Sequence, residues 1–355
     1  MRRPAEPQLP APPTRRRVLA LTQGRDVPSR RFRVAQYADA LRGHGIDLVE
    51  RPSGPGAYPP ARRSSRPAWL AATLLDRVPA VVDSWRADVT LLQRELVSTL
   101  RTLEGVTGRP RVLDVDDAIW LSRGGAFAAR IARGCDAVIC GNPFLADYFS
   151  RYASAVHVIP TAVDTDRYCP RAPADPDQVS SARPVLGWSG TSSGLPFLYE
   201  IEPALRAVLD ACPAATLRVI SDRAPRFAAL PPGRVEFVRW TPEVEVEALR
   251  TLTVGLMPLR DDDWARGKCS YKMLLYMACG VPVVASPVGM NGDVLALGPA
   301  GAAATSLTQW ADAVTLFLRD PGAARAAGLA GRAVVERHFA LPHVAERLAA
   351  VLCGV

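Results

Sequence analysis

The chain contains only two lysines, and both stand at the start of one expected helix. Lys268 and Lys272 belong to a total of 43 basic residues, and every other member of that set is arginine. Ser270 suits the N-cap, residues 271–279 have a helical pattern, and Gly280 suits the residue after the end. Cations at a helix start oppose the helix dipole unless an anion binds there. We therefore expect these two ammonium groups to hold a diphosphate, with ordinary surface lysines as the alternative.

A second loop of small residues, GWSGTSSG at 187–194, lies between an expected strand and an expected helix. Gly190, Thr191 and Ser192 are predicted to offer backbone N–H and hydroxyl groups to the same phosphates. The alternative is that these residues only satisfy the geometry of the turn. Residues after two further strands supply the remaining predicted contacts with the donor. Trp240 is expected to contact the base, and the other donor-binding residues are Gly289, Met290 and Asn291.

Three carboxylates stand at the end of the expected strand in RVLDVDDAIW, at Asp114, Asp116 and Asp117. An Asp-x-Asp pair in this position is able to hold Mg²⁺ or Mn²⁺ against a diphosphate. A metal would duplicate the work of the two lysines, so we predict no metal and no cofactor. Asp116 or Asp117 is expected to position an acceptor hydroxyl instead, and the alternative for Asp117 is a helix cap.

The segment PSRRFR at 28–33 is expected to begin the first helix, with Ser29 as its cap. Arg30, Arg31 and Arg33 crowd the positive end of that helix. An anion would relieve the repulsion, so an acceptor phosphate or a lipid headgroup is predicted at Ser29, Arg30 and Arg33. The alternative is that these arginines reflect a coding bias toward arginine throughout the chain.

The elements that must position these residues follow an α/β rhythm. Short β-rich runs alternate with helical stretches, as in a parallel sheet that is covered on both faces. The rhythm stops in a polar, proline-bearing stretch and then restarts. We therefore predict a disordered basic tail (1–16), an acceptor domain (17–168), a linker (169–183), a second domain (184–340) and a C-terminal helix (341–355) that packs back on the first domain. Ligands of such sheets bind beyond the carboxyl ends of the strands, in a cleft between the two domains.

Composition narrows the class of protein further. The 355 residues carry a net charge of +8, and all of the excess lies in residues 1–150, which hold 23 arginines and 15 acidic residues. This points to an anionic partner such as a lipid-linked phosphate or a membrane surface, with a solvated arginine surface as the alternative. No nucleic-acid recognition motif accompanies the charge. Seven unpatterned cysteines and the absence of an apolar run of membrane length predict a cytoplasmic protein, at most peripheral to the membrane.

Several stretches resemble the retaining glycosyltransferases of the GT-B fold, specifically the large family four group. They are HVIPTAVDTDRY (157–168), the run 186–208, and the run 254–295 that contains MACGVPVVASPVG. The resemblance covers most of residues 17–350. It implies two Rossmann-like, doubly wound domains, a nucleotide-sugar donor such as a UDP-sugar on the C-terminal domain, and an acceptor on the N-terminal one. It also implies a hexosyl transfer with retention and without a metal, in glycan biosynthesis. Our own expectation is that Lys268 and Lys272 neutralise the leaving diphosphate.

The chain departs from the family at two positions. Two family glutamates, eight positions apart, align with Gly267 and Leu275, and the usual basic pair is missing from the loop at 187–194. Lys268 and Lys272 are predicted to replace that basic pair. The departures keep two other functions open, which are a non-catalytic GT-B subunit that binds a nucleotide or a partner, and a nucleotide-sugar epimerase.

Overall fold

The computed structural model describes residues 15–25, 27–122, 124–171 and 183–355. Nearly all of the predicted basic tail and most of the predicted linker lie outside these ranges. The first sheet has the order β2-β1-β3-β4-β5-β6, and every pairing in it is parallel. Its strands are β1 (Arg16–Thr22), β2 (Ile46–Pro52), β3 (Val89–Gln93), β4 (Arg111–Val115), β5 (Ala137–Cys140) and β6 (Val156–Val158). β3 and β4 are buried at every position, as expected for a parallel sheet covered on both faces.

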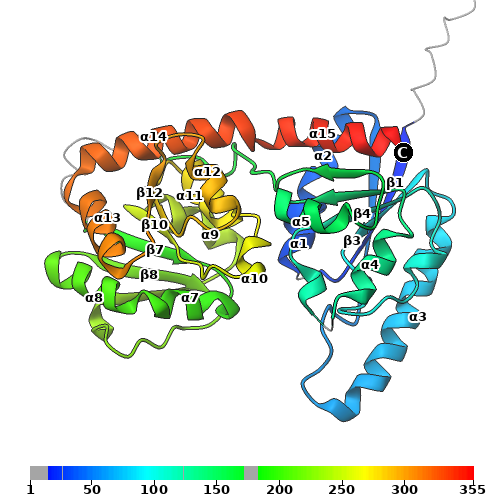
Figure 1. Cartoon of the computed structure of the whole chain (residues 1–355), viewed down its shortest axis with the longest axis horizontal. Coiled ribbons are helices and arrows are strands. Elements are labelled where there is room, and N and C mark those ends of the chain that lie inside the picture. Colours follow the sequence, from blue (N-terminus) through cyan, green and yellow to red (C-terminus); the bar gives the residue numbers. More distant parts are fainter. Residues whose placement is uncertain (1–14, 26, 123, 172–182) are drawn as a thin grey trace, which may run out of the picture.

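The helices of the first domain are mostly short. They are α1 (Pro28–Arg33), α2 (Ala38–Gly43), α3 (Arg66–Ser84), α4 (Ala126–Ala132) and α5 (Pro143–Phe149). The first helix, expected to begin at 28–33, is short, because Val34 leaves the helical conformation at φ −130° and a 3-10 turn, Ala35–Tyr37, separates α1 from α2. The longest, α3, lies along the outer edge of the domain (Figure 1).

The second sheet has the order β12-β11-β10-β7-β8-β9 and is also entirely parallel. Its strands are β7 (Val185–Ser189), β8 (Thr216–Ser221), β9 (Val235–Arg239), β10 (Val254–Met257), β11 (Val283–Ala285) and β12 (Gly301–Ala303). Its helices are α7 (Leu195–Glu200), α8 (Glu202–Ala211), α9 (Pro242–Arg250), α10 (Asp263–Arg266), α11 (Tyr271–Ala278), α12 (Met290–Leu295), α13 (Leu307–Arg319) and α14 (Pro321–His338). The prediction of two doubly wound parallel sheets is confirmed.

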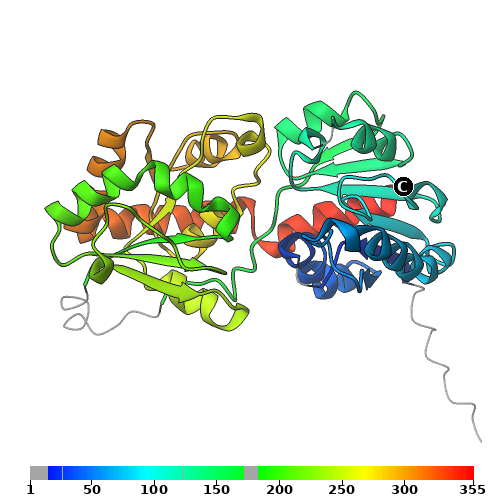
Figure 2. The ribbon, with the colours of Figure 1, turned by 90° about the horizontal axis from the view of Figure 1, so that it is seen from below.

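The last helix, α15 (Leu341–Gly354), returns to the first domain. α14 packs on α11 of the second domain, and α15 packs on α2 of the first. Val344 and Leu348 are buried in the same core cluster as Val18 and Leu41. Figures 1 and 2 show α14 and α15 running along one side of both domains, so the C-terminal helices connect the two sheets physically.

Strand order locates the points where a ligand site is expected. In the second sheet the order reverses between β7 and β10, and in the first it reverses between β1 and β3. Loops diverge at such a switch point and leave a crevice at the carboxyl ends of the strands. The GWSGTSSG loop follows β7, both lysines follow β10, and Arg94 follows β3.

Candidate functional site

The carboxyl ends of the two sheets meet through the loops that follow β4, β5 and β10. The thiol of Cys269 donates to the main-chain oxygen of Asp116 (3.2 Å), and the side-chain amide of Asn142 donates to the main-chain oxygen of Lys268 (3.0 Å). These contacts place the loop before α11 directly against the first domain. The two predicted groups, lysines and aspartates, therefore come together across the domain boundary.

Lys272 lies inside the loop that follows β7. A β-carbon at Gly190 would stand 2.5 Å from its Nζ, and one at Gly194 would stand 3.4 Å from it. The ammonium group also lies 4.8 Å from the ring centre of Trp188. Glycine is thus required at 190, because any side chain there would displace the ammonium group or the Trp188 ring. The structure brings the two predicted donor-binding elements together at this point.

The electrostatic surroundings of Lys272 favour an anion. Burial lowers its pKa, the neighbouring charge of Lys268 lowers it further and Asp117 raises it, which leaves the pKa at about 8. No carboxylate lies within ion-pair distance of its Nζ among the residues that the structure describes. A half-buried cation without a carboxylate partner is partly desolvated, and a bound diphosphate would offset the free energy that this desolvation costs.

Lys268 is paired with the opposite domain. Its Nζ lies 2.8 Å from Oδ1 of Asp117 and 4.1 Å from the ring centre of Trp264. Oδ2 of Asp117 also lies 3.5 Å from the guanidinium of Arg94. Asp117 therefore sits between two cations from different domains. It does not cap a helix, because the following 3-10 turn, Ile119–Leu121, has Ala118 at its N-cap.

Arg94 was not predicted as a site residue. It follows β3 in the left-handed region at φ 63°, a conformation that costs free energy in a residue other than glycine. Burial lowers its pKa, but Asp116 and Asp117 more than reverse that shift, so the guanidinium remains charged. The only sequence signal for it is its position directly after a buried strand at the switch point of the first sheet.

One carboxylate oxygen of Asp116 accepts no hydrogen bond from the described residues. Its Oδ1 is buried and has no hydrogen-bond partner among the described residues. Both side-chain polar atoms of Gln93, at the end of β3, are also buried without partners. Buried polar atoms in native structures are nearly always satisfied by protein, water or ligand, so this edge of the first sheet is suited to a polar ligand.

The predicted anion site at the first helix is wrong in its details. α1 begins at Pro28 with Val27 as its N-cap, so Ser29 lies inside the first turn and is buried. Arg33 makes a two-pronged ion pair with Asp114, at 2.9 and 2.7 Å, and only 2% of either side chain is exposed. Arg30 pairs with Glu50 at 2.7 Å. α1 is so short that Arg33 is its last residue, and protein carboxylates supply the anions that pair with Arg30 and Arg33.

A cluster of side chains from both domains surrounds Trp240. Its indole N–H donates to Glu245 on α9 (2.8 Å), and the guanidinium of Arg31 lies 4.9 Å from its ring centre. Arg31 also pairs with Glu245 at 3.0 Å across the domain boundary, and the hydroxyl of Tyr168 donates to that carboxylate. The proposed contact of Trp240 with a nucleotide base stays a prediction, and one face of the indole is already taken by Arg31.

The loop after β7 bonds some of its predicted phosphate donors within the protein. The N–H of Gly190 donates to the main-chain oxygen of Ile220, which continues the ladder beyond β7. The N–H and hydroxyl of Ser192 both donate to Asp222, at 2.6 and 2.9 Å. In this structure these groups are therefore already engaged within the protein, and the phosphate contacts of Gly190, Thr191 and Ser192 stay a prediction.

The predicted donor residues after β11 shape the start of α11. Asn291 is fully buried, donates to the main-chain oxygen of Ser286 (3.0 Å) and accepts from the hydroxyl of Ser270 (2.7 Å). Ser270 occupies the expected N-cap position at φ 51°, but its side chain makes no capping bond. Met290 is buried, and the main chain of Gly289 passes so close to Arg266 that a β-carbon would stand 2.9 Å from it. Asn291 thus fixes Ser270, and with it the first residue of the lysine-bearing helix.

Gly267 and Leu275, the positions that align with the two family glutamates, both lie in closely packed surroundings. A β-carbon at Gly267 would stand 2.7 Å from that of Ala118 in the first domain. Leu275 is 3% exposed and belongs to the main core cluster. Gly267 has no room for a side chain in this arrangement of the domains, and a carboxylate at 275 would be buried among apolar side chains. The departure at Gly267 is therefore accommodated by close contact between the domains.

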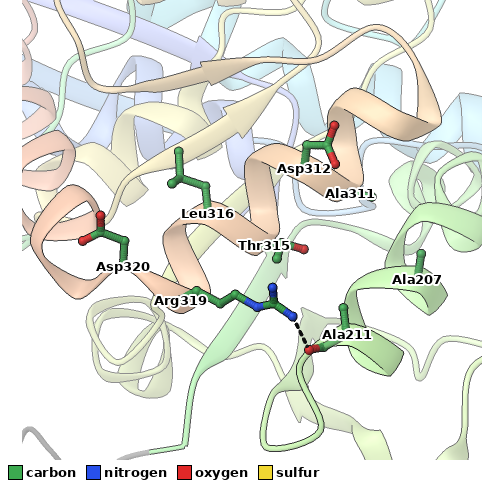
Figure 3. Close-up of a pocket in the computed structure, with 8 residues that line it drawn as sticks. All are labelled: Ala207, Ala211, Ala311, Asp312, Thr315, Leu316, Arg319 and Asp320. Atoms are coloured by element: carbon green, nitrogen blue, oxygen red, sulfur yellow. Dashed lines mark hydrogen bonds between the residues drawn. The ribbon is translucent and has the colours of Figure 1, made fainter.

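A groove of about 530 Å³ lies between α8 and α13 (Figure 3). Asp312, Arg319 and Asp320 line it, and Arg319 donates to the main-chain oxygen of Ala211 (2.7 Å). No predicted site residue lines this groove. Within the described ranges, no helix is both long and apolar enough to cross a bilayer, and no cluster of three or more His, Cys, Asp or Glu side chains has the arrangement of a metal site.

Comparison with known proteins agrees with this architecture. Residues 183–320 match the family model described as glycosyl transferases group 1. Sucrose-phosphate synthase from Thermosynechococcus elongatus superposes with a TM-score of 0.68 at 16% identity, over 95% of this chain and 98% of that one. The chain has the GT-B fold, and its second domain is similar to the group 1 glycosyl transferases over residues 183–320.

Two further GT-B structures resemble this GT-B chain along their whole length. Anabaena HepE, solved in complex with UDP and glucose, has a TM-score of 0.64 at 15% identity and covers 96% of this chain and 100% of that one. WaaG, a glycosyltransferase involved in lipopolysaccharide biosynthesis, has a TM-score of 0.65 at 14% identity, with coverage of 95% and 100%. A comparison with curated protein sequences finds no match.

Proposed function

We propose that this GT-B chain is a glycosyltransferase that moves a sugar from a nucleoside diphosphate sugar to an acceptor hydroxyl, with retention and without a metal. The bond between the anomeric carbon and the diphosphate breaks, and the acceptor oxygen forms the new bond on the same face of the sugar. The observation that carries the proposal is Lys272, a half-buried ammonium group that lies against the loop after β7 and has no carboxylate within ion-pair distance among the described residues.

The two lysines would divide the work on the leaving group. Lys272 would hold the diphosphate in the ground state, and Lys268 would neutralise the charge that grows on it as the sugar departs. Because Lys268 pairs with Asp117 in this structure, the diphosphate would have to compete with that carboxylate. The three aspartates after β4 also argue for metal-free transfer, since Asp114 is paired with Arg33 and Asp117 with Lys268.

The acceptor would lie at the carboxyl edge of the first sheet. Asp116, through its unpartnered Oδ1, would accept a hydrogen bond from the attacking hydroxyl and orient it. The amide of Gln93 offers a further donor and acceptor at the same edge. Because the first 150 residues carry the whole excess positive charge, we propose an anionic or lipid-linked acceptor, reached from the cytoplasmic face of a membrane.

A thermal-shift panel of UDP, GDP and ADP, each with Mg²⁺ or with a chelator, tests the donor site. One nucleoside diphosphate should raise the melting temperature of the natural chain equally in both conditions. The Lys268→Ala, Lys272→Ala double variant should lose that shift. Arg206→Ala, which removes an exposed cation on α8, should keep it. A panel in which no diphosphate shifts the natural chain would contradict the proposal.

Turnover separates the three functions that the sequence leaves open. Labelled donor incubated with lipid extracts should yield a labelled lipid if the chain is a transferase. The packing of Gly267 against Ala118 gives the non-catalytic alternative its specific support, because no glutamate fits there. Donor binding without turnover over any acceptor would favour that alternative. Conversion of the donor with no acceptor present would favour an epimerase.

A further inference from the structure

Helix α3 is packed with its polar side inward. The buried side chains of this helix are Thr73, Arg77, Ala80 and Ser84. Four large apolar side chains are exposed, with Leu75 72% exposed, Val78 49%, Val82 50%, and Trp85, just after the helix, 67%. Trp69, Leu70, Leu74 and Val81 are half-buried. A helix of a soluble domain normally buries its apolar stripe and exposes its polar one. The outward face of α3 is therefore left uncovered by the described residues.

The apolar stripe is continuous along the helix. Its other exposed members are Ala68, Ala71, Ala72 and Pro79, all at helical spacing with Leu75 and Val82. A helix of 19 residues extends for about 28 Å. Figure 1 shows α3 at the outer edge of the first domain, away from the second domain. The stripe is thus a long exposed surface, which in a soluble protein marks a site of interaction.

The charged side chains within α3 lie off the centre of this face. Arg77 is buried and donates to the main-chain oxygen of Thr22 (2.6 Å). Asp83 pairs with Arg51 at 2.9 Å, and Asp76 accepts a hydrogen bond from the main chain of Gly54. Asp76 is exposed and Asp83 half-buried, and both lie along one border of the stripe, so its central line from Ala68 through Leu75 to Val82 carries no charge.

Exposed arginines stand at both ends of the stripe. Arg62, Arg63 and Arg66 lie at its beginning, and Arg86 follows Trp85 at its end. In the described part of the chain, none of the four has a carboxylate within 4.0 Å. An apolar stripe with cations at both ends and no acid on it is complementary to a surface that is both apolar and negatively charged.

We propose that the outward face of α3 docks on a membrane that contains anionic lipids. Leu75, Val78 and Val82 enter the boundary between headgroups and acyl chains, Trp85 lies at the interface, and the flanking arginines contact lipid phosphates. Lipid binding of this kind does not depend on the proposed function. The purpose of this lipid binding rests on the proposed function. β2 ends at Pro52, at the edge of the first sheet where the acceptor is proposed to bind, and the chain runs from there into α3.

A second copy of the chain suits this face less well. If two α3 helices paired in opposite directions, Arg86 of one copy would face Arg62 and Arg63 of the other. If they paired in the same direction, each arginine would stand beside its own counterpart. Both arrangements place like charges together, which weakens association. An anionic bilayer attracts the arginines at both ends.

Vesicle flotation tests the proposal with the full-length chain. The natural chain should float with vesicles of phosphatidylglycerol and phosphatidylcholine, and less with phosphatidylcholine alone. The Leu75→Asp, Val82→Asp double variant should bind anionic vesicles at least about tenfold more weakly. The matched control is Leu316→Asp, Leu329→Asp, which changes leucines of the second domain that are 51% and 57% exposed, and it should float like the natural chain.

Two results would overturn the proposal. One is equal flotation of the natural chain and the α3 double variant. The other is no flotation together with a dimer, seen by ultracentrifugation, that the α3 variant abolishes, because the face would then bind a second copy. Nucleoside diphosphate binding is measured on the same proteins without vesicles. Failure of the donor site and failure of membrane docking are thereby recorded separately.

Discussion

The sequence predicts cations at the starts of two helices, but in the structure these cations differ in position and in partners, since Arg33 is the last residue of α1. At α1 the cations lie beside acidic residues of neighbouring strands, and Arg33 is locked to the buried carboxylate of Asp114. At α11, Lys272 reaches a loop of small residues in which no carboxylate approaches its Nζ. The first cation is part of the folded core, whereas the second is placed for a ligand. A cation at a helix start predicts an anion, and only the neighbouring strands decide whether the protein supplies it.

Removal of Arg33 should have the largest effect. Arg33→Leu leaves Asp114 unpaired in the core and should lower the free energy of unfolding by about 3–5 kcal/mol, measured by urea denaturation. Adding Asp114→Leu should recover much of that loss, because no buried charge then remains. Arg42→Ala, in an exposed pair with Asp39, should cost less than about 1 kcal/mol. If Arg33→Leu proved no more costly than Arg42→Ala, the distinction between the two helix starts would fail.

Removal of Lys272 should weaken nucleotide binding without lowering the stability of the fold. Lys272→Met should unfold at the same or a higher urea concentration, because it removes a half-buried charge that has no carboxylate partner among the described residues. Its affinity for the nucleoside diphosphate should fall about 10- to 100-fold, since a charge-assisted hydrogen bond contributes roughly 1.5–3 kcal/mol. Calorimetric titration gives the affinity. A marked loss of stability with unchanged affinity would make Lys272 a structural residue like Arg33.

The smallest effect is expected at Asp117. Asp117→Asn releases Lys268 from a partly exposed ion pair, and such pairs contribute about 0.2–1 kcal/mol. Nucleoside diphosphate affinity should therefore rise about two- to fivefold. The rate of transfer should fall, because the negative charge that lies between Lys268 and Arg94 is removed. The two readouts are the dissociation constant and the turnover rate. A fall in affinity would show that Asp117 supports the donor site instead of competing with the donor.

The sequence predicts the fold better than the details of the site. Buried β-rich runs predict both parallel sheets, and the cation-rich start of 271–279 identifies the helix that meets the loop after β7. The partners of Arg33 and Ser192 lie 81 and 30 positions away, so only tertiary packing assigns them. Arg94 was missed because its role depends on the approach of the β4 loop. The packing of Gly267 against Ala118 likewise exists only once the two domains meet.

The titration of Lys272 tests the central claim most directly. Because the chain has only two lysines, selective ¹³C and ¹⁵N labelling of lysine gives one NMR signal for each side chain. In the free protein Lys272 should titrate at about 8 instead of its ordinary 10.5. A bound diphosphate stabilises the charged form, so the pKa should rise, and nucleotide affinity should weaken as the pH increases above 8. A pKa that does not change at saturating nucleoside diphosphate would contradict the account.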